Sequence, residues 1–163
     1  MESQQLLSLK LGEALIKNKL VMTTAESCTG GGVSTAITDI AGSSAWFDRA
    51  FVTYSNEAKM EMLGVREQTL EKHGAVSEET VVEMVQGALS NSLASVGVSI
   101  SGIAGPGGAT ESKPVGTVCF AWADEKGWQK VATHCFSGDR AAVRQQAVEC
   151  AMRTLYEELS KRA

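Results

Sequence analysis

A serine in a glycine-rich turn is the residue of this sequence best placed to act as a nucleophile. Ser27 lies in segment 25–31, which reads AESCTGG and follows a short apolar run that we expect to be a strand. A strand that stops at a serine before a helix start exposes the hydroxyl beside unpaired backbone N–H groups. Those groups and the positive end of the helix dipole can hold an anion or a developing oxyanion. Ser27 is therefore a candidate nucleophile, although a turn or capping hydroxyl is the commoner role of such a serine.

A lysine about thirty residues later could take the proton of that hydroxyl. Ser55 or Asn56 can cap a helix, and if Asn56 is the cap, Lys59 lies in its first turn, where the helix dipole disfavours the charged ammonium. A lysine made neutral in this way can act as a base toward a serine. Tyr54, at the end of the preceding strand, could donate or relay a proton. Against this, a helical lysine is usually a solvated surface charge, and a tyrosine is usually part of the core.

Cys28 is a second possible nucleophile in the same turn. A helix start close to a thiol can lower its pKa and make it reactive. A cysteine in such a place is more often a small buried hydrophobic residue. The sequence leaves both alternatives open.

Two further segments could bind an anionic ligand. Segment 101–108 follows an apolar strand and holds four glycines, so its N–H groups could approach a ligand closely, although a plain tight connection is an equal alternative. Arg140 and Arg144 share one face at the start of the last helix, which would suit a phosphate or a carboxylate. Two exposed arginines are more often solvated surface.

The elements that must position these residues follow from hydrophobic periodicity, capping residues and turn signals. Helices are predicted over 4–18 and 29–38, from Ser55 or Asn56, from Ser77, and from Asp139 to near the end of the chain. Strands are predicted over 20–25, 50–54, 96–101, 115–123 and 128–136, the last two joined as a hairpin by 124–127. This alternation predicts an α/β fold, a single-domain layered α/β/α arrangement whose mixed sheet includes a hairpin in the C-terminal half. We expect one domain over 1–163.

Composition narrows the classes of function. A net charge of −4 without a basic stripe argues against nucleic-acid binding, and no apolar segment is long enough to cross a membrane. Four cysteines without a C-x-x-C pair and two histidines make a zinc site improbable, so no metal is expected. The N-terminus lacks the pattern of a secretory signal, and reduced thiols suit a cytoplasmic protein.

Five motifs in one order resemble the CinA C-terminal-domain family, in the form of its stand-alone nicotinamide-nucleotide amidases. The resemblance covers about residues 7–156. It rests on TAESCTGG (24–31), YSNEAK (54–59), GAVS (74–77), SGIAGP (101–106) and KPVGTV (113–118).

The resemblance implies hydrolysis of the carboxamide of nicotinamide mononucleotide, giving nicotinate mononucleotide and ammonia in pyridine-nucleotide recycling. It implies Ser27 as the nucleophile, Lys59 as its base and Tyr54 as an assisting group, forming an acyl-enzyme without metal or other cofactor. A small-molecule nucleotide is the implied substrate and a homodimer the implied assembly. Substrate-binding residues would be Thr29, Gly30, Gly31, Gly102, Gly105 and Arg140. A nucleotide-sensing or partner-binding module without turnover is the alternative, since the same anion-binding features need not catalyse.

Overall fold

A computed structural model describes residues 3–162 of the chain. The helices are α1 (Ser3–Lys17), α2 (Gly32–Thr38), α3 (Asn56–Leu63), α4 (Glu67–His73), α5 (Glu78–Ser90) and α6 (Arg140–Ser160), with a short 3-10 turn at Ser43–Ala45. The strands are β1 (Met22–Glu26), β2 (Phe47–Val52), β3 (Val96–Gly102), β4 (Thr117–Asp124) and β5 (Gln129–Cys135).

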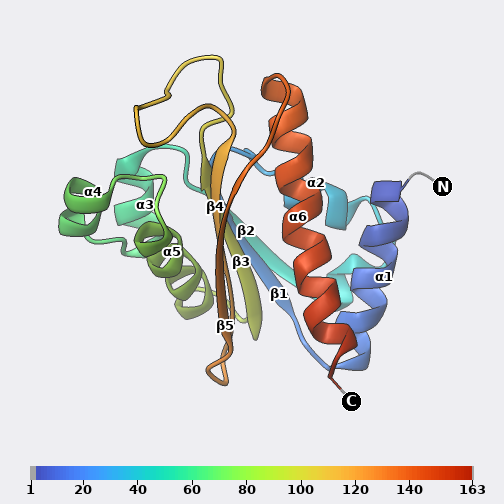
Figure 1. Cartoon of the computed structure of the whole chain (residues 1–163). Helices are drawn as coiled ribbons and strands as arrows, with labels where there is room; N and C mark the ends of the chain where they lie inside the picture. Colours follow the sequence, from blue (N-terminus) through green and yellow to red (C-terminus); the bar gives the residue numbers. More distant parts are fainter. Residues whose placement is uncertain (1–2, 163) are drawn as a thin grey trace.

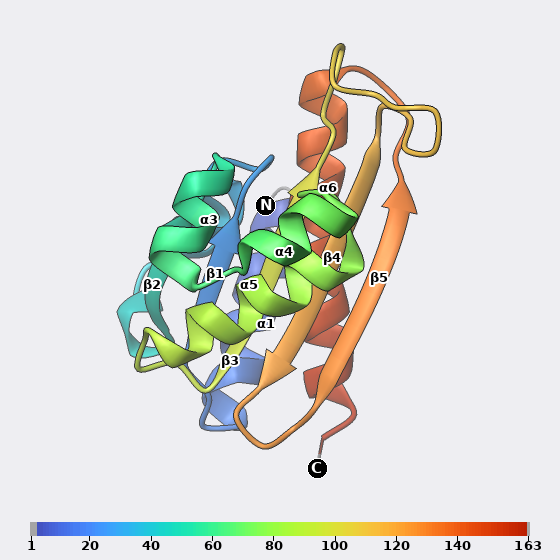
Figure 2. The same ribbon diagram turned by 90° about the vertical axis from the view of Figure 1, so that its left-hand side faces the viewer.

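The five strands form one mixed sheet in the order β2-β1-β3-β4-β5 (Figure 2). β1 pairs in parallel with both β2 and β3, whereas β4 and β5 form an antiparallel hairpin on β3. The predicted mixed sheet and its hairpin in the C-terminal half are therefore confirmed. Because β1, β2 and β3 run the same way, the segments that follow them meet at one end of the sheet. In α/β sheets this end is where ligands usually bind.

Helices cover both faces of the sheet, as the predicted layers require. Figure 1 shows α1, α2 and α6 on one face and α3, α4 and α5 on the other. Each face has its own buried cluster: Leu11, Trp122 and Met152 lie in the larger one, and Met84 and Val85 in the smaller one. β3 and β4 are buried almost throughout because they lie between the two layers.

The polar residues expected to start helices do so. The side chains of Ser55, Ser77 and Asp139 each accept a hydrogen bond from the backbone N–H three residues further on, which satisfies one free donor of the first turn. The cap of α3 is thus Ser55 and not Asn56. Lys59 consequently lies just after the first turn, and its own N–H donates to Ser55 O at 3.1 Å.

The structure adds one helix that was not predicted, and several elements begin at other residues than predicted. α4 was not predicted, and its preceding residue, Arg66, makes no capping hydrogen bond that the sequence could have announced. β2 begins at Phe47 rather than at 50, and α2 begins at Gly32 rather than at 29. The later start of α2 follows from Gly30 and Gly31, whose φ angles of +60° and +102° cannot belong to a right-handed helix.

None of the helices within residues 3–162 is both long enough and apolar enough to cross a membrane. Over the same residues, no group of three or more His, Cys, Asp or Glu side chains is arranged to hold a metal ion.

Candidate active site

Ser27 is held in place at the carboxyl end of β1. Its backbone N–H donates to Ile100 O at 3.0 Å, which continues the pairing with β3 one residue beyond the strand. Its side chain is nearly buried and lies on the side of the sheet covered by α3. The hydroxyl therefore has a fixed position: it donates to Tyr54 O at 3.5 Å, and its closer neighbour is a side chain.

That neighbour is Lys59. Its Nζ donates to Ser27 Oγ at 3.0 Å, to Thr53 O at 2.9 Å and to Tyr54 O at 3.3 Å. The side chain is 1% exposed and forms no ion pair with any residue in 3–162. Burial lowers the pKa of Lys59 below its ordinary value. Lys59 is therefore not the solvated surface lysine that the sequence left as an alternative.

Ser27 and Lys59 open into a cavity of about 250 Å³. Its walls come from the segments that follow β1, β2 and β3, from residues 75–76 and from the start of α6. Among the lining residues are Cys28, Tyr54, Gly102, Gly105 and Arg140. Six of the predicted site residues thus lie around one cavity: Ser27, Tyr54, Lys59, Gly102, Gly105 and Arg140.

Arg140 joins two sides of the cavity mouth. Its guanidinium donates to Gly105 O at 2.8 Å and to Tyr54 Oη at 3.2 Å. Tyr54 is 63% exposed and so is not a core residue. Gly105 has a φ of +86°, and a Cβ there would lie 2.5 Å from Val115 Cγ1, so the loop needs glycine at this position.

Thr29, Gly30 and Gly31 are not brought into this cavity. They line a separate hollow of about 400 Å³ together with Arg144. The Thr29 hydroxyl is used within the protein, because it donates to Glu26 Oε1 at 2.7 Å. Arg144 also acts apart from Arg140, since it donates to Cys28 O at 3.0 Å and to Thr29 O at 3.2 Å.

The N-terminus of α2 is occupied by the protein itself. The carboxylate of Glu26 accepts from Val33 N at 2.9 Å and from Ser34 N at 3.0 Å. The expected oxyanion site at this helix start is therefore filled. Other donors line the cavity: the backbone N–H groups of Cys28, Ala104 and Gly105 donate to no other residue within 3–162.

Cys28 has the properties of a buried thiol. It is 5% exposed, and burial raises its pKa to about 11. Thiolate, the reactive form, is therefore scarce at neutral pH. The structure favours the serine over the cysteine as the nucleophile.

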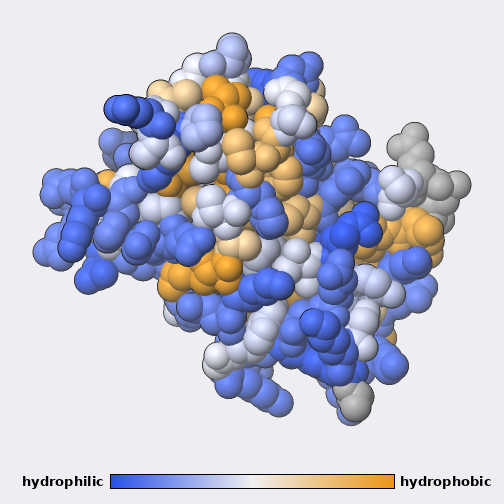
Figure 3. Space-filling view, in the orientation of Figure 1, coloured by the Kyte–Doolittle hydropathy of each residue, from blue (hydrophilic) through white to orange (hydrophobic). Residues whose placement is uncertain are grey.

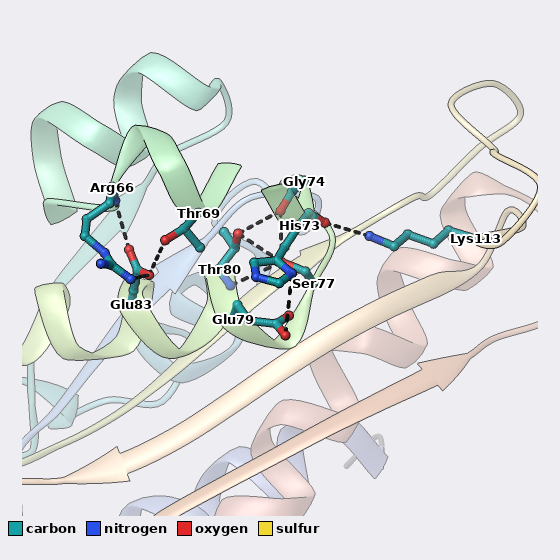
Figure 4. Close-up of polar contacts among 9 residues, drawn as sticks. All are labelled: Arg66, Thr69, His73, Gly74, Ser77, Glu79, Thr80, Glu83 and Lys113. Carbon is teal, nitrogen blue, oxygen red and sulfur yellow. Dashed lines mark hydrogen bonds and ion pairs between the residues drawn. The ribbon is translucent and has the colours of Figure 1, made fainter. Parts of the chain in front are cut away.

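The wall at residues 75–76 is fixed by a polar network around the start of α5 (Figure 4). Gly74 O accepts from Ser77 Oγ at 2.9 Å and from Thr80 Oγ1 at 2.7 Å. Lys113 reaches across from the loop after β3 and donates to His73 O at 3.0 Å. This bond ties the glycine-rich wall of the cavity to the wall formed by 75–76.

A larger hollow of about 540 Å³ lies beside α4, α5 and β5, lined mostly by polar side chains and without a serine or cysteine. Its acidic side chains are engaged with neighbours. Glu83 accepts from Arg66 and Thr69, and Glu79 lies 3.7 Å from His73 (Figure 4). Glu78 accepts from Thr133. We assign these polar contacts a structural role, in which they hold α4 against α5.

Reasoning from the residues alone did not assign roles to Glu26, to the Thr53 carbonyl or to residues 75–76. Glu26 and residues 75–76 belong to two of the motifs singled out above, which was the available signal. The Thr53 carbonyl had none, because a backbone acceptor leaves no trace in residue type.

The chain matches known proteins over most of its length. The CinA C-terminal domain family matches residues 4–159. The nicotinamide-nucleotide amidohydrolase PncC of Escherichia coli K12 is 60% identical over 152 residues, which are 93% of this chain and 92% of that protein. The protein of the same name from Enterobacter agglomerans is 56% identical over 155 residues, 95% of this chain and 94% of that one.

Solved structures agree with the fold. The competence/damage inducible protein CihA from Agrobacterium tumefaciens superposes with a TM-score of 0.94 at 40% identity, covering 98% of this chain and 97% of that one. The competence damage-inducible protein A from Klebsiella pneumoniae gives a TM-score of 0.95 at 40% identity, covering 99% and 100%.

Proposed function

The chain belongs to the CinA C-terminal domain family, and on that premise we propose that it hydrolyses the carboxamide of nicotinamide mononucleotide, releasing ammonia and nicotinate mononucleotide. Two relatives at 60% and 56% identity, named nicotinamide-nucleotide amidohydrolases, support the choice of substrate. The observation that carries the proposal is the 3.0 Å contact between Lys59 Nζ and Ser27 Oγ, made by a buried lysine without an ion-pair partner within 3–162.

The three acceptors around Lys59 Nζ match the three N–H groups of an ammonium, and the same contacts also suit the neutral amine that we propose as the base. A neutral amine has two N–H groups and one lone pair. The carbonyls of Thr53 and Tyr54 can take both N–H groups, which leaves the lone pair facing the hydroxyl of Ser27. Lys59 would then accept the hydroxyl proton while Ser27 Oγ bonds to the carboxamide carbon.

The acyl-enzyme forms and breaks by the same groups in turn. Negative charge develops on the carboxamide oxygen, and we propose the N–H groups of Cys28, Ala104 and Gly105, which line the cavity, as its donors. Protonated Lys59 gives its proton to the departing nitrogen, so the C–N bond breaks and ammonia leaves. Lys59 next takes a proton from water as the water oxygen bonds to the ester carbon. It then gives that proton to Ser27 Oγ as the ester C–O bond breaks, which frees the acid product and restores Ser27 and neutral Lys59.

Arg140 is the proposed anchor of the substrate phosphate. It lies at the cavity mouth, and two of its donors already contact Gly105 O and Tyr54 Oη, which fixes its direction. Phosphate binding remote from the reacting amide would supply energy for positioning it. Tyr54 would assist from the same side of the mouth.

An ammonia-release assay tests the proposal with nicotinamide mononucleotide, its riboside and free nicotinamide as substrates. We expect the mononucleotide to be turned over best and Ser27→Ala to be inactive. The alternative, a sensing module, predicts tight binding of the mononucleotide by calorimetry with no ammonia from the wild-type protein over hours.

We also propose that the chain forms a homodimer, as the resemblance implies, and that it works in the cytoplasm, which its free cysteines suit. β5 is an edge strand whose outer side pairs with no other strand in residues 3–162. Figure 3 shows apolar side chains gathered over the upper part of the face that carries this edge. Sedimentation equilibrium gives the test, and a single species at the mass of one 17.2 kDa chain would contradict the dimer.

A further inference from the structure

Glu26 is a buried acid that the proposed mechanism does not use. It is fully buried, yet it immediately precedes Ser27. Its two carboxylate oxygens accept four hydrogen bonds: from Thr24 Oγ1 at 3.2 Å, Thr29 Oγ1 at 2.7 Å, Val33 N at 2.9 Å and Ser34 N at 3.0 Å. A buried carboxylate with four hydrogen bonds, next to the proposed nucleophile, is a candidate for a role in the reaction.

Glu26 and Ser27 face opposite layers of the molecule. Neighbouring residues at the end of a strand point to opposite faces of the sheet. The Glu26 side chain accordingly meets the first turn of α2, while the Ser27 side chain meets Lys59 of α3. The backbone between them is also fixed, because Glu26 O accepts from Thr53 N at 2.9 Å and Ser27 N donates to Ile100 O at 3.0 Å.

We propose that Glu26 is a positioning residue for the hydrolysis, one that holds the turn after β1 so that Ser27 Oγ stays against Lys59 Nζ. This inference rests on the proposed function. By filling the start of α2, the same carboxylate also removes that helix end as an anion site, which leaves Arg140 and the loop after β3 to receive the substrate phosphate. Arg144 supports the same turn from α6 through the carbonyls of Cys28 and Thr29.

The role requires a group that only accepts hydrogen bonds. Each carboxylate oxygen takes one backbone N–H of α2, Val33 N on Oε1 and Ser34 N on Oε2. A glutamine of the same size would have to turn its NH₂ group toward one of these donors, because an amide has a single oxygen. Glu26→Gln thus changes the turn without changing its volume.

Two measurements on Glu26→Gln test the inference, both made well below the melting temperature of the variant. The first is kcat and KM for ammonia release from nicotinamide mononucleotide. The second is the rate at which a small fluorophosphonate labels Ser27, followed by intact mass. We expect kcat and the labelling rate to fall about 100-fold, as for a nucleophile displaced by about 1 Å, with KM changed by less than about threefold.

Thr23→Val is the matched control. Thr23 is as buried as Glu26 and lies in the same strand, toward the end away from Ser27. Its replacement by valine removes one hydrogen bond, which Thr23 Oγ1 donates to Arg49 O at 2.7 Å. We expect this variant to melt earlier but to label and turn over like the wild type. If Glu26→Gln does not fold, Thr29→Val removes one bond to Glu26 and should slow labelling several-fold.

The outcomes separate the inference from the function it rests on. A wild-type protein that labels at Ser27 but releases no ammonia refutes the substrate, while the labelling of Glu26→Gln still tests the positioning. Wild-type rates of labelling in folded Glu26→Gln, or in Thr29→Val where only that variant folds, overturn the inference. A wild-type Ser27 that does not label at all overturns it as well, since no activated serine would then exist to be positioned.

Discussion

Alkylation of the free thiols separates the two nucleophiles that segment 25–31 offers. Iodoacetamide reacts with thiolate, so the rate at each cysteine follows the ionised fraction and the exposure of its sulfur. With a pKa of about 11, only about one Cys28 thiol in a thousand is ionised at pH 8, against about one in ten for the ordinary value of 9.0. Cys28 should therefore react about 100-fold more slowly than an ordinary cysteine, before its burial slows it further.

Cys135 supplies the control within the same molecule, because it is exposed. Peptide mapping during the reaction should show Cys135 modified first, with ammonia release from nicotinamide mononucleotide undiminished. Cys28→Ala should keep kcat within about threefold, as expected for a packing change outside the chemistry. The reasoning is refuted if Cys28 is modified as fast as Cys135 and activity falls in step, or if Cys28→Ala is inactive while Ser27→Ala turns over.

Four other predictions concern three charged residues. kcat/KM should rise with pH through a pKa below the ordinary lysine value of 10.5, and Lys59→Met should lose that rise together with about 10²- to 10⁴-fold in rate. Between the lowered pKa of Lys59 and pH 10.5, the unfolded chain binds the Lys59 proton more readily than the folded chain does. The free energy of unfolding should therefore rise with pH over this range, and thermal melts of Lys59→Met should lack that rise. Arg140→Met should raise KM for the mononucleotide about tenfold and leave KM for the riboside unchanged, which steady-state kinetics checks; equal effects on both would remove Arg140 from the phosphate. Lys113→Met, which loses the bond to His73 O, should raise KM about fivefold with kcat unchanged, and an altered kcat at constant KM would contradict a role in shaping the cavity.

Local signals in the sequence were enough for most of the fold. Ser55, Ser77 and Asp139 cap their helices because a side-chain oxygen can meet an N–H three residues on whatever lies elsewhere. The hairpin of β4 and β5 follows likewise from the short polar turn between two strands. These features depend on near neighbours along the chain.

The features that sequence reasoning missed depend on distant neighbours. α4 is short, lacks a capping side chain and is held by Glu83 of α5, to which Arg66 N and Thr69 Oγ1 donate. The sequence predicted a free anion site at the start of α2. The turn after β1 instead brings the Glu26 carboxylate onto Val33 N and Ser34 N, and the number of residues between them does not announce this contact.

The burial of Lys59 is a tertiary effect of the same kind. Its acceptors come from the end of β2 and from the turn after β1, which the sheet brings together by pairing β1 with β2. Residue types offered Lys59 as a possible base for Ser27 but left the surface lysine open, and the family resemblance favoured placing the two in one site. The 3.0 Å contact is what the fold adds.

The covalent intermediate gives the most direct test of the central claim. Wild-type protein mixed with excess nicotinamide mononucleotide and quenched in acid should carry the substrate minus ammonia as an ester, mapped to the peptide that holds Ser27. Lys59→Met, treated in the same way, should carry none. An adduct on Cys28, or undiminished ammonia release by folded Ser27→Ala, would contradict the account.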